Sequence, residues 1–278
     1  RADRSPGEFY QLDFEMSFAT QEDVFKIGEE VLTSTFEKFA PEGYEVTKAP
    51  YPIISYKQAM LEFGSDKPDL RNPLRIIDVT DFFQKCTFKP FIGKTVRAIK
   101  VHANMSKGFH EKLLKFATGI GMGGLGYLEI ADDMSYKGPI DKFIPDEYKA
   151  ELAELAGLVP GDTIFFIADK EERANLYAGQ LRNEIGKRLD LYEKNAFRFC
   201  FVNDFPMFEY DNEEKKIVFT HNPFSMPQGG LEALNTKNPL DILAYQYDIV
   251  CNGIELSSGA VRNHDLDIIC LLYTSPSP

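Results

Sequence analysis

Two carboxylates near the end of this 278-residue chain, Asp248 and Glu255, are spaced so that they could share a metal ion. They are seven positions apart, so a regular strand would point them to opposite faces of a sheet. Asn252-Gly253 lies between them and signals a turn or a bulge, and one added bulge residue would bring both carboxylates to one side. Two carboxylates together with a triphosphate are a usual way to hold Mg²⁺. A hairpin with solvent-facing acids is the alternative.

A second group of polar residues alternates strictly with apolar ones over residues 10–18. This alternation predicts a strand with one face in a core and the other presenting polar groups. An ordinary solvated face is the alternative interpretation. The apolar positions are Tyr10, Leu12, Phe14, Met16 and Phe18, and the polar ones are Gln11, Asp13, Glu15 and Ser17.

Two further motifs each allow a functional and a purely structural interpretation. His221 stands before Asn222-Pro223-Phe224, and a lone histidine in a loop is either structural or a ligand contact. The string GIGMGG at 119–124 matches GxGxxG in form. A dinucleotide site requires this string after a strand and before a helix, whereas here it follows an expected helix and precedes an expected strand. The pattern therefore predicts a glycine-rich turn.

The residue patterns predict the elements that must position these side chains. Thr20 and Asp23 resemble a capping box that begins a helix extending to residue 39. Residues 64–73, GSDKPDLRNP, have the composition of a loop. Further helices are expected at 57–63, 107–118, 145–155 and 170–191, and strands at 51–56, 95–102, 124–131, 163–168, from 199 onward and at 245–256.

The amino-acid composition limits the classes of function that this chain can have. A hydrophobic content of 44% is ample for a large core. No apolar run approaches the roughly 18 residues of a membrane span. The four cysteines are dispersed without a CxxC pair, which favours a reduced compartment and argues against a structural zinc site. The net charge of −12 argues mildly against RNA as a partner.

Several strings resemble bacterial-type aspartyl-tRNA synthetases, a class II family. RADRSPGEFYQLDFEMSF at 1–18 resembles the second half of motif 2, and GSDKPDLRNP is close to a family signature. YDIVCNGIELSSGAVR at 247–262 is similar to the family string YDLVxNGxELGGGSxRIH. The resemblance extends over about residues 1–269, with further matches at 204–208 and 220–224.

The resemblance implies an α+β fold in which an antiparallel sheet flanked by helices is split by an insertion. The first part of the catalytic domain would be residues 1–82 and the second part residues 204–269. Residues 83–203 would form an α+β insertion domain shared with an amidotransferase B subunit. Residues 270–278 fit no continuation of the family sequence, so we expect a non-native tail that is disordered or unpacked.

The resemblance also implies residue roles, with catalysis by positioning and charge neutralisation rather than by a protein nucleophile. Glu15 would support the pocket from behind. Ser5 would take the place of an ATP-contacting glutamine, although one inserted residue separates the two patterns. The other implied contacts are Gln11, Asp13, His221 and Arg262 with L-aspartate, Asp248 and Glu255 with Mg²⁺ and ATP, and Arg1 and Arg4 with the tRNA acceptor end.

The implied activity is that of an aspartate–tRNA ligase. ATP would activate L-aspartate to aspartyl-adenylate, and the aspartyl group would pass to tRNA for Asp and, in some members, also Asn. The full-length enzyme would be a cytoplasmic homodimer without membrane contact. The chain begins inside motif 2, so we expect a fragment that lacks both ends and has no measurable aspartylation activity alone.

Two other classes stay open. The chain could be a non-catalytic synthetase paralogue or an RNA-binding module of the amidotransferase type. It could also be an unrelated hydrolase rich in carboxylates. Joint retention of five site residues favours the ligase, because burying charges without a ligand costs free energy. These residues are Asp13, His221, Asp248, Glu255 and Arg262.

Overall fold

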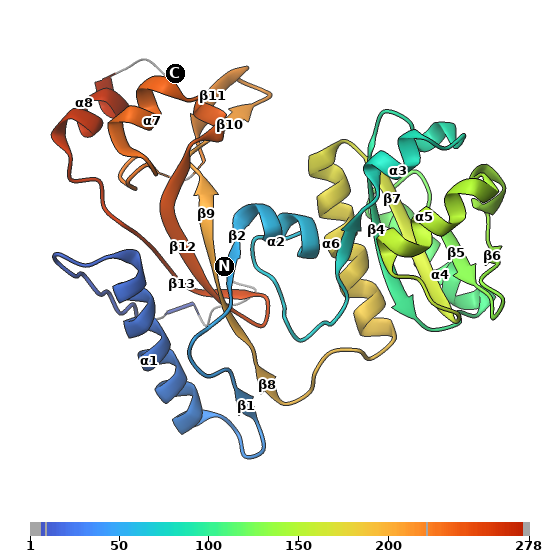
Figure 1. Cartoon of the computed structure of the whole chain (residues 1–278). Coiled ribbons are helices and arrows are strands. Elements are labelled where there is room, and N and C mark those ends of the chain that lie inside the picture. Colours follow the sequence, from blue (N-terminus) through green and yellow to red (C-terminus); the bar gives the residue numbers. More distant parts are fainter. Residues whose placement is uncertain (1–6, 9, 221, 275–278) are drawn as a thin grey trace.

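Two bodies, each built on its own sheet, lie side by side along this chain (Figure 1). The structure is a computed structural model that describes residues 7, 8, 10–220 and 222–274. The first body contains α1 (Gln21–Phe39), β1 (Glu45–Val46), β2 (Ile53–Ser55), α2 (Tyr56–Phe63), β8 (Ala196–Phe197), β9 (Phe199–Pro206), β10 (Phe208–Asp211), β11 (Lys216–Phe219), α7 (Gly230–Thr236), β12 (Leu243–Cys251), β13 (Ile254–Ala260) and α8 (Leu266–Thr274). The second contains β3 (Ile76–Asp78), α3 (Thr80–Gln84), β4 (Thr95–His102), α4 (Lys107–Gly119), β5 (Gly126–Ile130), β6 (Tyr136–Lys137), α5 (Asp146–Ala156), β7 (Asp162–Asp169) and α6 (Glu171–Arg188).

The sheet of the first body has the strand order β13-β12-β9-β2, antiparallel except for the parallel β9–β2 pair. Alternate residues of β9 point to opposite faces. Phe199 and Phe201 pack towards α1, where Phe25 stacks on Phe201 with ring centroids 3.9 Å apart. Cys200 and Val202 pack on the other face, against α2. The central strands are therefore covered on both sides and give the sheet a fixed register.

Local sequence signals set the limits of the helices around this sheet. Thr20 accepts a hydrogen bond from the backbone of Asp23, whose carboxylate in turn accepts one from the Thr20 backbone. This capping box confirms the predicted start of α1. Ser55 caps α2 in a similar way, and Gly64 ends α2 in the left-handed conformation that glycine adopts without strain.

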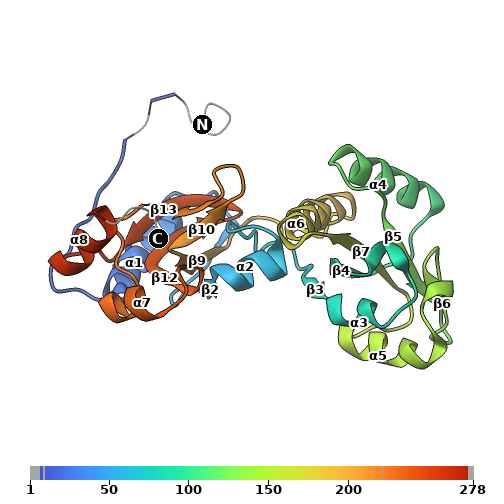
Figure 2. The ribbon, with the colours of Figure 1, turned by 90° about the horizontal axis from the view of Figure 1, so that it is seen from above.

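The second sheet is antiparallel throughout, with the order β3-β4-β7-β5-β6. Helices α4 and α6 cover one face, while α3 and α5 cover the other (Figure 2). Strand β7 is buried on both sides, with Phe165 facing the first pair of helices and Phe166 facing the second. The two sheets with their helices confirm the predicted α+β class. The predicted domain limits at 82/83 and 203/204 stay predictions, and β3 and α3 begin before residue 83.

The predicted strand over residues 10–18 is wrong for this structure. The segment has no regular strand, and it runs away from the first body (Figure 2). Its apolar side chains are exposed, with Tyr10 at 99% and Phe18 at 110%. A strand needs a hydrogen-bonded neighbour, and among the described residues no strand pairs with this segment. Alternation alone therefore does not order the backbone here.

The predicted disorder of residues 270–278 is wrong where the chain is described. Residues up to 274 belong to α8, which lies against α7 (Figure 1). Ile268 is buried, and Leu272 packs against a cluster that includes Phe208 and Ile242. An amphipathic turn with apolar residues four apart can cover such a cluster. The remaining part of that prediction, residues 275–278, lies outside the described residues.

The glycine-rich string 119–124 lies between the end of α4 and the start of β5, as the sequence indicated. Its position excludes the strand-to-helix turn of a dinucleotide site. A search of the described helices finds none long and apolar enough to cross a membrane.

Candidate functional site

The hairpin β12–β13 brings the two predicted acids to one side. Asn252 and Gly253 form its turn, with φ of 53° and 80°, which is the combination that Asn-Gly favours in tight hairpins. The register shifts after Ile249, so that Asp248 pairs with Ser258 while Glu255 pairs with Val250. This bulge confirms the predicted geometry, and the role of the pair in binding stays a prediction.

Lys67 completes this group, and sequence analysis assigned it no role. Its Nζ lies 3.4 Å from Asp248 Oδ2 and 3.4 Å from Glu255 Oε2. A third carboxylate, Asp66, is closer, at 2.6 Å from its Oδ2. The signal that could have found Lys67 is the loop string at 64–73, which was singled out as family-like without a chemical assignment. Three acids thus surround one ammonium in the described part of the chain.

The electrostatics of the group follow from burial. Asp248 is 5% exposed, and burial, with the neighbouring charge of Glu255, raises the pKa of Asp248 to about 6. The Lys67 ammonium acts in the opposite direction without outweighing the burial. Burial also acts to lower the pKa of Lys67, but the hydrogen bond to Asp66 and the nearby carboxylates leave it above its ordinary value. Lys67 is therefore charged at neutral pH.

The carboxylates of this group fit a Mg²⁺ site completed by water and phosphates better than a site made entirely of protein ligands. Within the described residues no three His, Cys, Asp or Glu side chains are grouped to hold a metal ion. A cage made entirely of protein ligands therefore has no support there. Mg²⁺ commonly binds one or two carboxylates and takes its other ligands from water and substrate phosphates. Asp248 and Glu255, which already share one cation, fit that arrangement.

Arg262 lies two residues after the end of β13. Within β13, Ala260 shares a face with Ser258, the partner of Asp248, and Arg262 is the next residue but one along the chain. The Arg262 guanidinium lies over the Phe224 ring, 4.9 Å from its centroid, and its backbone bridges to Ser225. No carboxylate in the described part of the chain forms an ion pair with Arg262. Its bidentate donors are thus available to an anion.

The structure brings only some of the other predicted residues to this face. Residues 222–225, which follow His221, lie against Arg262 through Phe224 and Ser225. Gln11 donates a hydrogen bond of 2.7 Å to Asp13, but both are exposed on the segment that leaves the body, as is Glu15. These residues are therefore not at the acid pair in this structure. Four predicted residues lie outside the described ones: Arg1, Arg4, Ser5 and His221.

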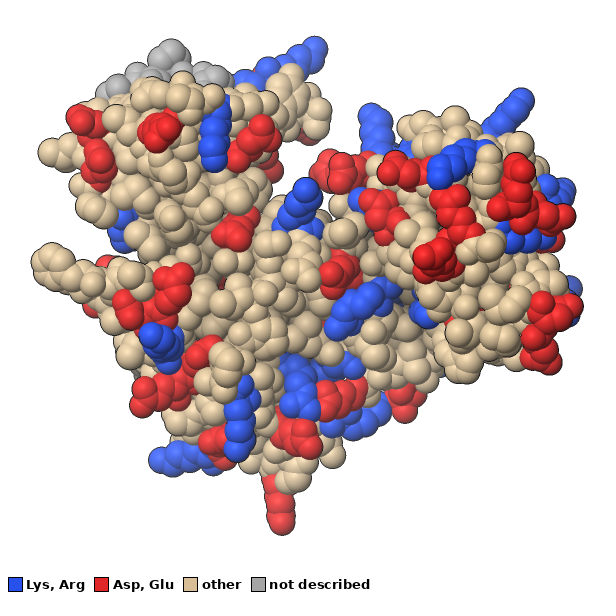
Figure 3. All heavy atoms as spheres, in the orientation of Figure 1, with Lys and Arg blue, Asp and Glu red and all other residues tan. Residues whose placement is uncertain are grey.

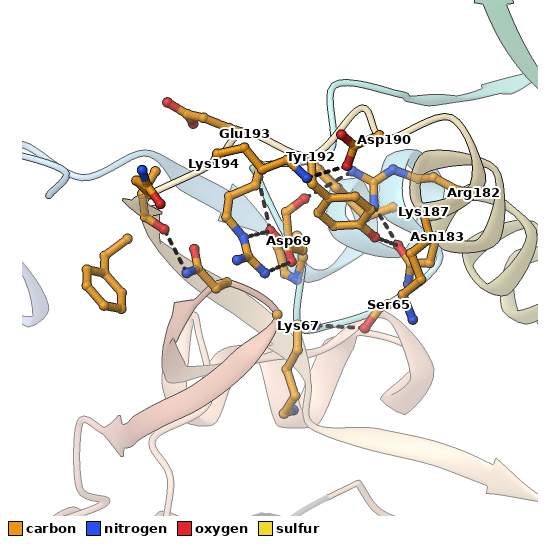
Figure 4. Close-up of a pocket in the computed structure, with 18 of the residues that line it drawn as sticks. Ser65, Lys67, Asp69, Arg182, Asn183, Lys187, Asp190, Tyr192, Glu193 and Lys194 are labelled. Atoms are coloured by element: carbon orange, nitrogen blue, oxygen red, sulfur yellow. Dashed lines mark hydrogen bonds and ion pairs between the residues drawn. The ribbon is translucent and has the colours of Figure 1, made fainter. Parts of the chain in front are cut away.

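A separate hollow lies on the other side of the loop that carries Lys67 (Figure 4). Its walls come from this loop, from the end of α6, from the segment before β8, from residues near the end of α1 and from the turn of the β12–β13 hairpin, Asn252-Gly253. Several of its charges pair with one another, such as Arg71 with Asp69 and Lys194 with Asp190. The Lys67 side chain points out of this hollow towards β12 and β13 (Figure 4). We place the candidate site on the acid-pair side, where Asp248 and Glu255 share one ammonium and Arg262 has no ion-pair partner among the described residues.

The first body is thus a mostly antiparallel sheet flanked by helices, with an acid pair on one hairpin and an arginine just beyond it. Residues 1–271 match the family model of the class II tRNA synthetases (D, K and N), so the chain belongs to this family. Enzymes of this class generally use ATP and Mg²⁺.

Similar curated proteins indicate which kind of class II tRNA synthetase this chain resembles. The chain is 54% identical over 276 residues to the aspartate–tRNA(Asp/Asn) ligase of Ehrlichia chaffeensis, and 55% identical over 276 residues to that of Zymomonas mobilis. It is 51% identical over 271 residues to the aspartate–tRNA ligase of Streptomyces avermitilis. Each match covers 97% of this chain and 46% of the relative, so the chain spans about half the length of these curated relatives. The predicted resemblance is confirmed.

Proposed function

We propose that this chain is the part of an aspartate–tRNA ligase that binds L-aspartate and ATP. The observation that carries the proposal is the hairpin β12–β13, where two acids share one cation and Arg262 follows two residues beyond the second strand. The names of the relatives support the same activity. In the reaction, the α-carboxylate of aspartate attacks the α-phosphorus of ATP and pyrophosphate leaves. The terminal hydroxyl of tRNA then takes the aspartyl group and AMP leaves.

The residues of the hairpin would act by position and charge. Asp248 and Glu255 would hold Mg²⁺, which would neutralise charge on the phosphates of ATP. Arg262 would bind the side-chain carboxylate of aspartate through two parallel hydrogen bonds, and it would thereby select aspartate over asparagine. Preorganised charges of this kind lower a barrier without a protein nucleophile.

The remaining contacts are part of the same proposal. Gln11 and Asp13 would meet the substrate ammonium once the segment 10–18 lies against the site, and His221 would contact the bound aspartate. Arg1 and Arg4 would contact the tRNA acceptor end, with Ser5 near ATP. On the face drawn in Figure 3, acidic and basic side chains are interspersed over both bodies. Because the net charge of this chain is −12, much of the basic surface for tRNA would lie in other parts of the protein. The proposal also includes a homodimer for the whole protein and a cytoplasmic location.

The test compares two stable analogues of the adenylate, aspartyl- and asparaginyl-sulfamoyl adenosine, by calorimetry. The unaltered chain should prefer the aspartyl compound, because Arg262 pairs with a charged carboxylate. In Arg262→Gln this preference should fall by about tenfold or more, since a charge-assisted pair is replaced by neutral hydrogen bonds.

Arg173→Gln is the matched control, because Arg173 is exposed on α6 in the second body. It should leave the preference unchanged. Equal affinity of the unaltered chain for both analogues would contradict the proposed role of Arg262, and no binding of either would contradict the proposed function.

A further inference from the structure

Lys67 occupies the place where the proposed function needs a different cation. Its ammonium lies 3.4 Å from an oxygen of each member of the acid pair. An ammonium and a divalent ion prefer the same carboxylate oxygens, so the two compete for Asp248 and Glu255. Two cations within a few ångströms in a partly buried site also repel each other strongly. A metal ion can therefore bind the pair well only if Lys67 moves.

The backbone beneath Lys67 is firmly held. Its amide donates to Ser65 Oγ at 3.0 Å. The loop ends are pressed on α6, where a Cβ at Gly179 would lie 2.5 Å from Gly64 O. Arg182, also on α6, donates to the carbonyls of Asp69 at 3.1 Å and Asn72 at 2.8 Å. Movement of the ammonium must therefore come from the four-carbon side chain and not from the loop.

The same loop provides a second place for the ammonium. Asp66 Oδ2 already lies 2.6 Å from Lys67 Nζ, closer than either member of the acid pair. Rotation of the lysine side chain about its own bonds can keep this contact while it gives up the other two. The free-energy cost of leaving the acid pair is thus reduced, because Asp66 is the neighbour of Lys67 on the same loop and keeps its contact with the ammonium.

We infer that Lys67 is a resident counter-ion of the Asp248–Glu255 pair, and that a divalent cation displaces it towards Asp66. The inference rests on the proposed function, because the acid pair must be a metal site. In the absence of metal, the single charge of Lys67 reduces the repulsion between the two carboxylates. When the metal arrives, the lysine keeps its charge on the loop beside the site.

The test measures Mn²⁺ binding to the chain at pH 8 by electron paramagnetic resonance, with Mn²⁺ as the probe for the divalent site. Lys67→Met should bind Mn²⁺ about tenfold or more tightly than the unaltered chain, because the competing cation is gone. Asp66→Asn should bind it more weakly, since the displaced lysine then has no second partner. The opposite directions of the two variants guard against a general effect of misfolding.

Lys85→Met is the matched control. It removes the same charge and a 2.7 Å contact with Glu151, but it lies on the second body. Its Mn²⁺ affinity should equal that of the unaltered chain. A double variant, Lys67→Met with Asp248→Asn, should lose the gain if binding occurs at the acid pair.

Two results would overturn the inference and are distinguishable. If the unaltered chain binds Mn²⁺ in an Asp248-dependent manner, and Lys67→Met binds it equally or more weakly, the lysine is not a competitor and the metal site stands. If neither the unaltered chain nor Lys67→Met binds Mn²⁺, the acid pair is not a metal site and the proposed function loses its main support.

Discussion

Burial of the Asp248 carboxyl lowers the free energy of unfolding of this protein when the carboxyl is ionised. Its pKa of about 6, against an ordinary value of 3.8, means that the folded state binds a proton more tightly than the unfolded one. The difference corresponds to about 3 kcal/mol of stability when the carboxyl is ionised. Because the folded pKa is raised, the penalty is absent below pH 4 and grows as pH rises to 6. A bound cation would offset this loss of stability, and carboxyl groups with shifted pKa values of this kind are common in binding sites.

The first prediction concerns the pH dependence of stability. In Asp248→Asn, the free energy of unfolding should exceed that of the unaltered chain by about 1–3 kcal/mol at pH 8, and the difference should vanish near pH 4. Chemical denaturation at both pH values, in buffer with a chelator, measures it. A constant difference across this range would show that burial of the carboxylate is not the cause.

Asp211→Asn provides a control of opposite sign. Asp211 is partly exposed, and backbone hydrogen bonds from Glu214 and Glu213 lower its pKa. A lowered pKa contributes stability that is present above pH 4 and is lost in acid. Asp211→Asn should therefore lose a little stability at pH 8 and none at low pH.

At the residue scale, the sequence predicted the acid pair but missed its cation. Asn252-Gly253 is a local turn signal, and a single bulge was enough to infer that Asp248 and Glu255 share a face. Lys67 is 181 positions from Asp248, and no local pattern connects them. Only the packing of the 64–73 loop against β12 and β13 shows the contact.

Among the elements, α6 has a distinct role in holding the site together. Gly179, Arg182 and Gly186 lie three and four positions apart, so they form one face of the helix. The two glycines let the loop backbone and Asn72 approach closely. Arg182 is 1% exposed and is bound by carbonyl groups, and burial lowers its pKa to about 10. A helix of the second body thus fixes the loop that serves the first.

The second prediction tests this face. Gly179→Ala should lower the free energy of unfolding by about 1–3 kcal/mol, because a Cβ would lie 2.5 Å from Gly64 O, and overpacking of this kind strains both backbones. Gly108→Ala is the matched helical control, because nothing lies within 4 Å of its Cβ position. It should be neutral or stabilising by up to about 1 kcal/mol, as expected for alanine in a helix. Equal effects of the two substitutions would mean that the close approach is not needed.

The elements that sequence predicted well are those with local causes. The Thr20 capping box set the start of α1, and the alternation over 95–102 matched β4 residue for residue. The alternation over 10–18 was equally regular but produced no strand, because pairing depends on a neighbour distant in sequence. The prediction of a disordered tail was wrong for the opposite reason. Packing against the cluster around Phe208 orders a helix that the composition of the tail did not indicate.

In the whole molecule, the two bodies meet at the loop between α2 and β3. One side of this loop faces the acid pair, and the other lines the hollow shown in Figure 4. The arrangement gives the second body a structural part in the site, because α6 holds the loop that carries Lys67. Sequence analysis could not show which body supports Lys67, because the contacts of its loop with α6 join residues more than 100 positions apart.

A crystal structure of the chain with L-aspartate, Mn²⁺ and α,β-methylene-ATP, an analogue that cannot release pyrophosphate, would show the proposed site by observation. We expect an anomalous manganese peak between Asp248 and Glu255, with the side-chain carboxylate of aspartate on Arg262. A manganese peak elsewhere, or a ligand bound in the hollow lined by Arg71 and Tyr192, would contradict it.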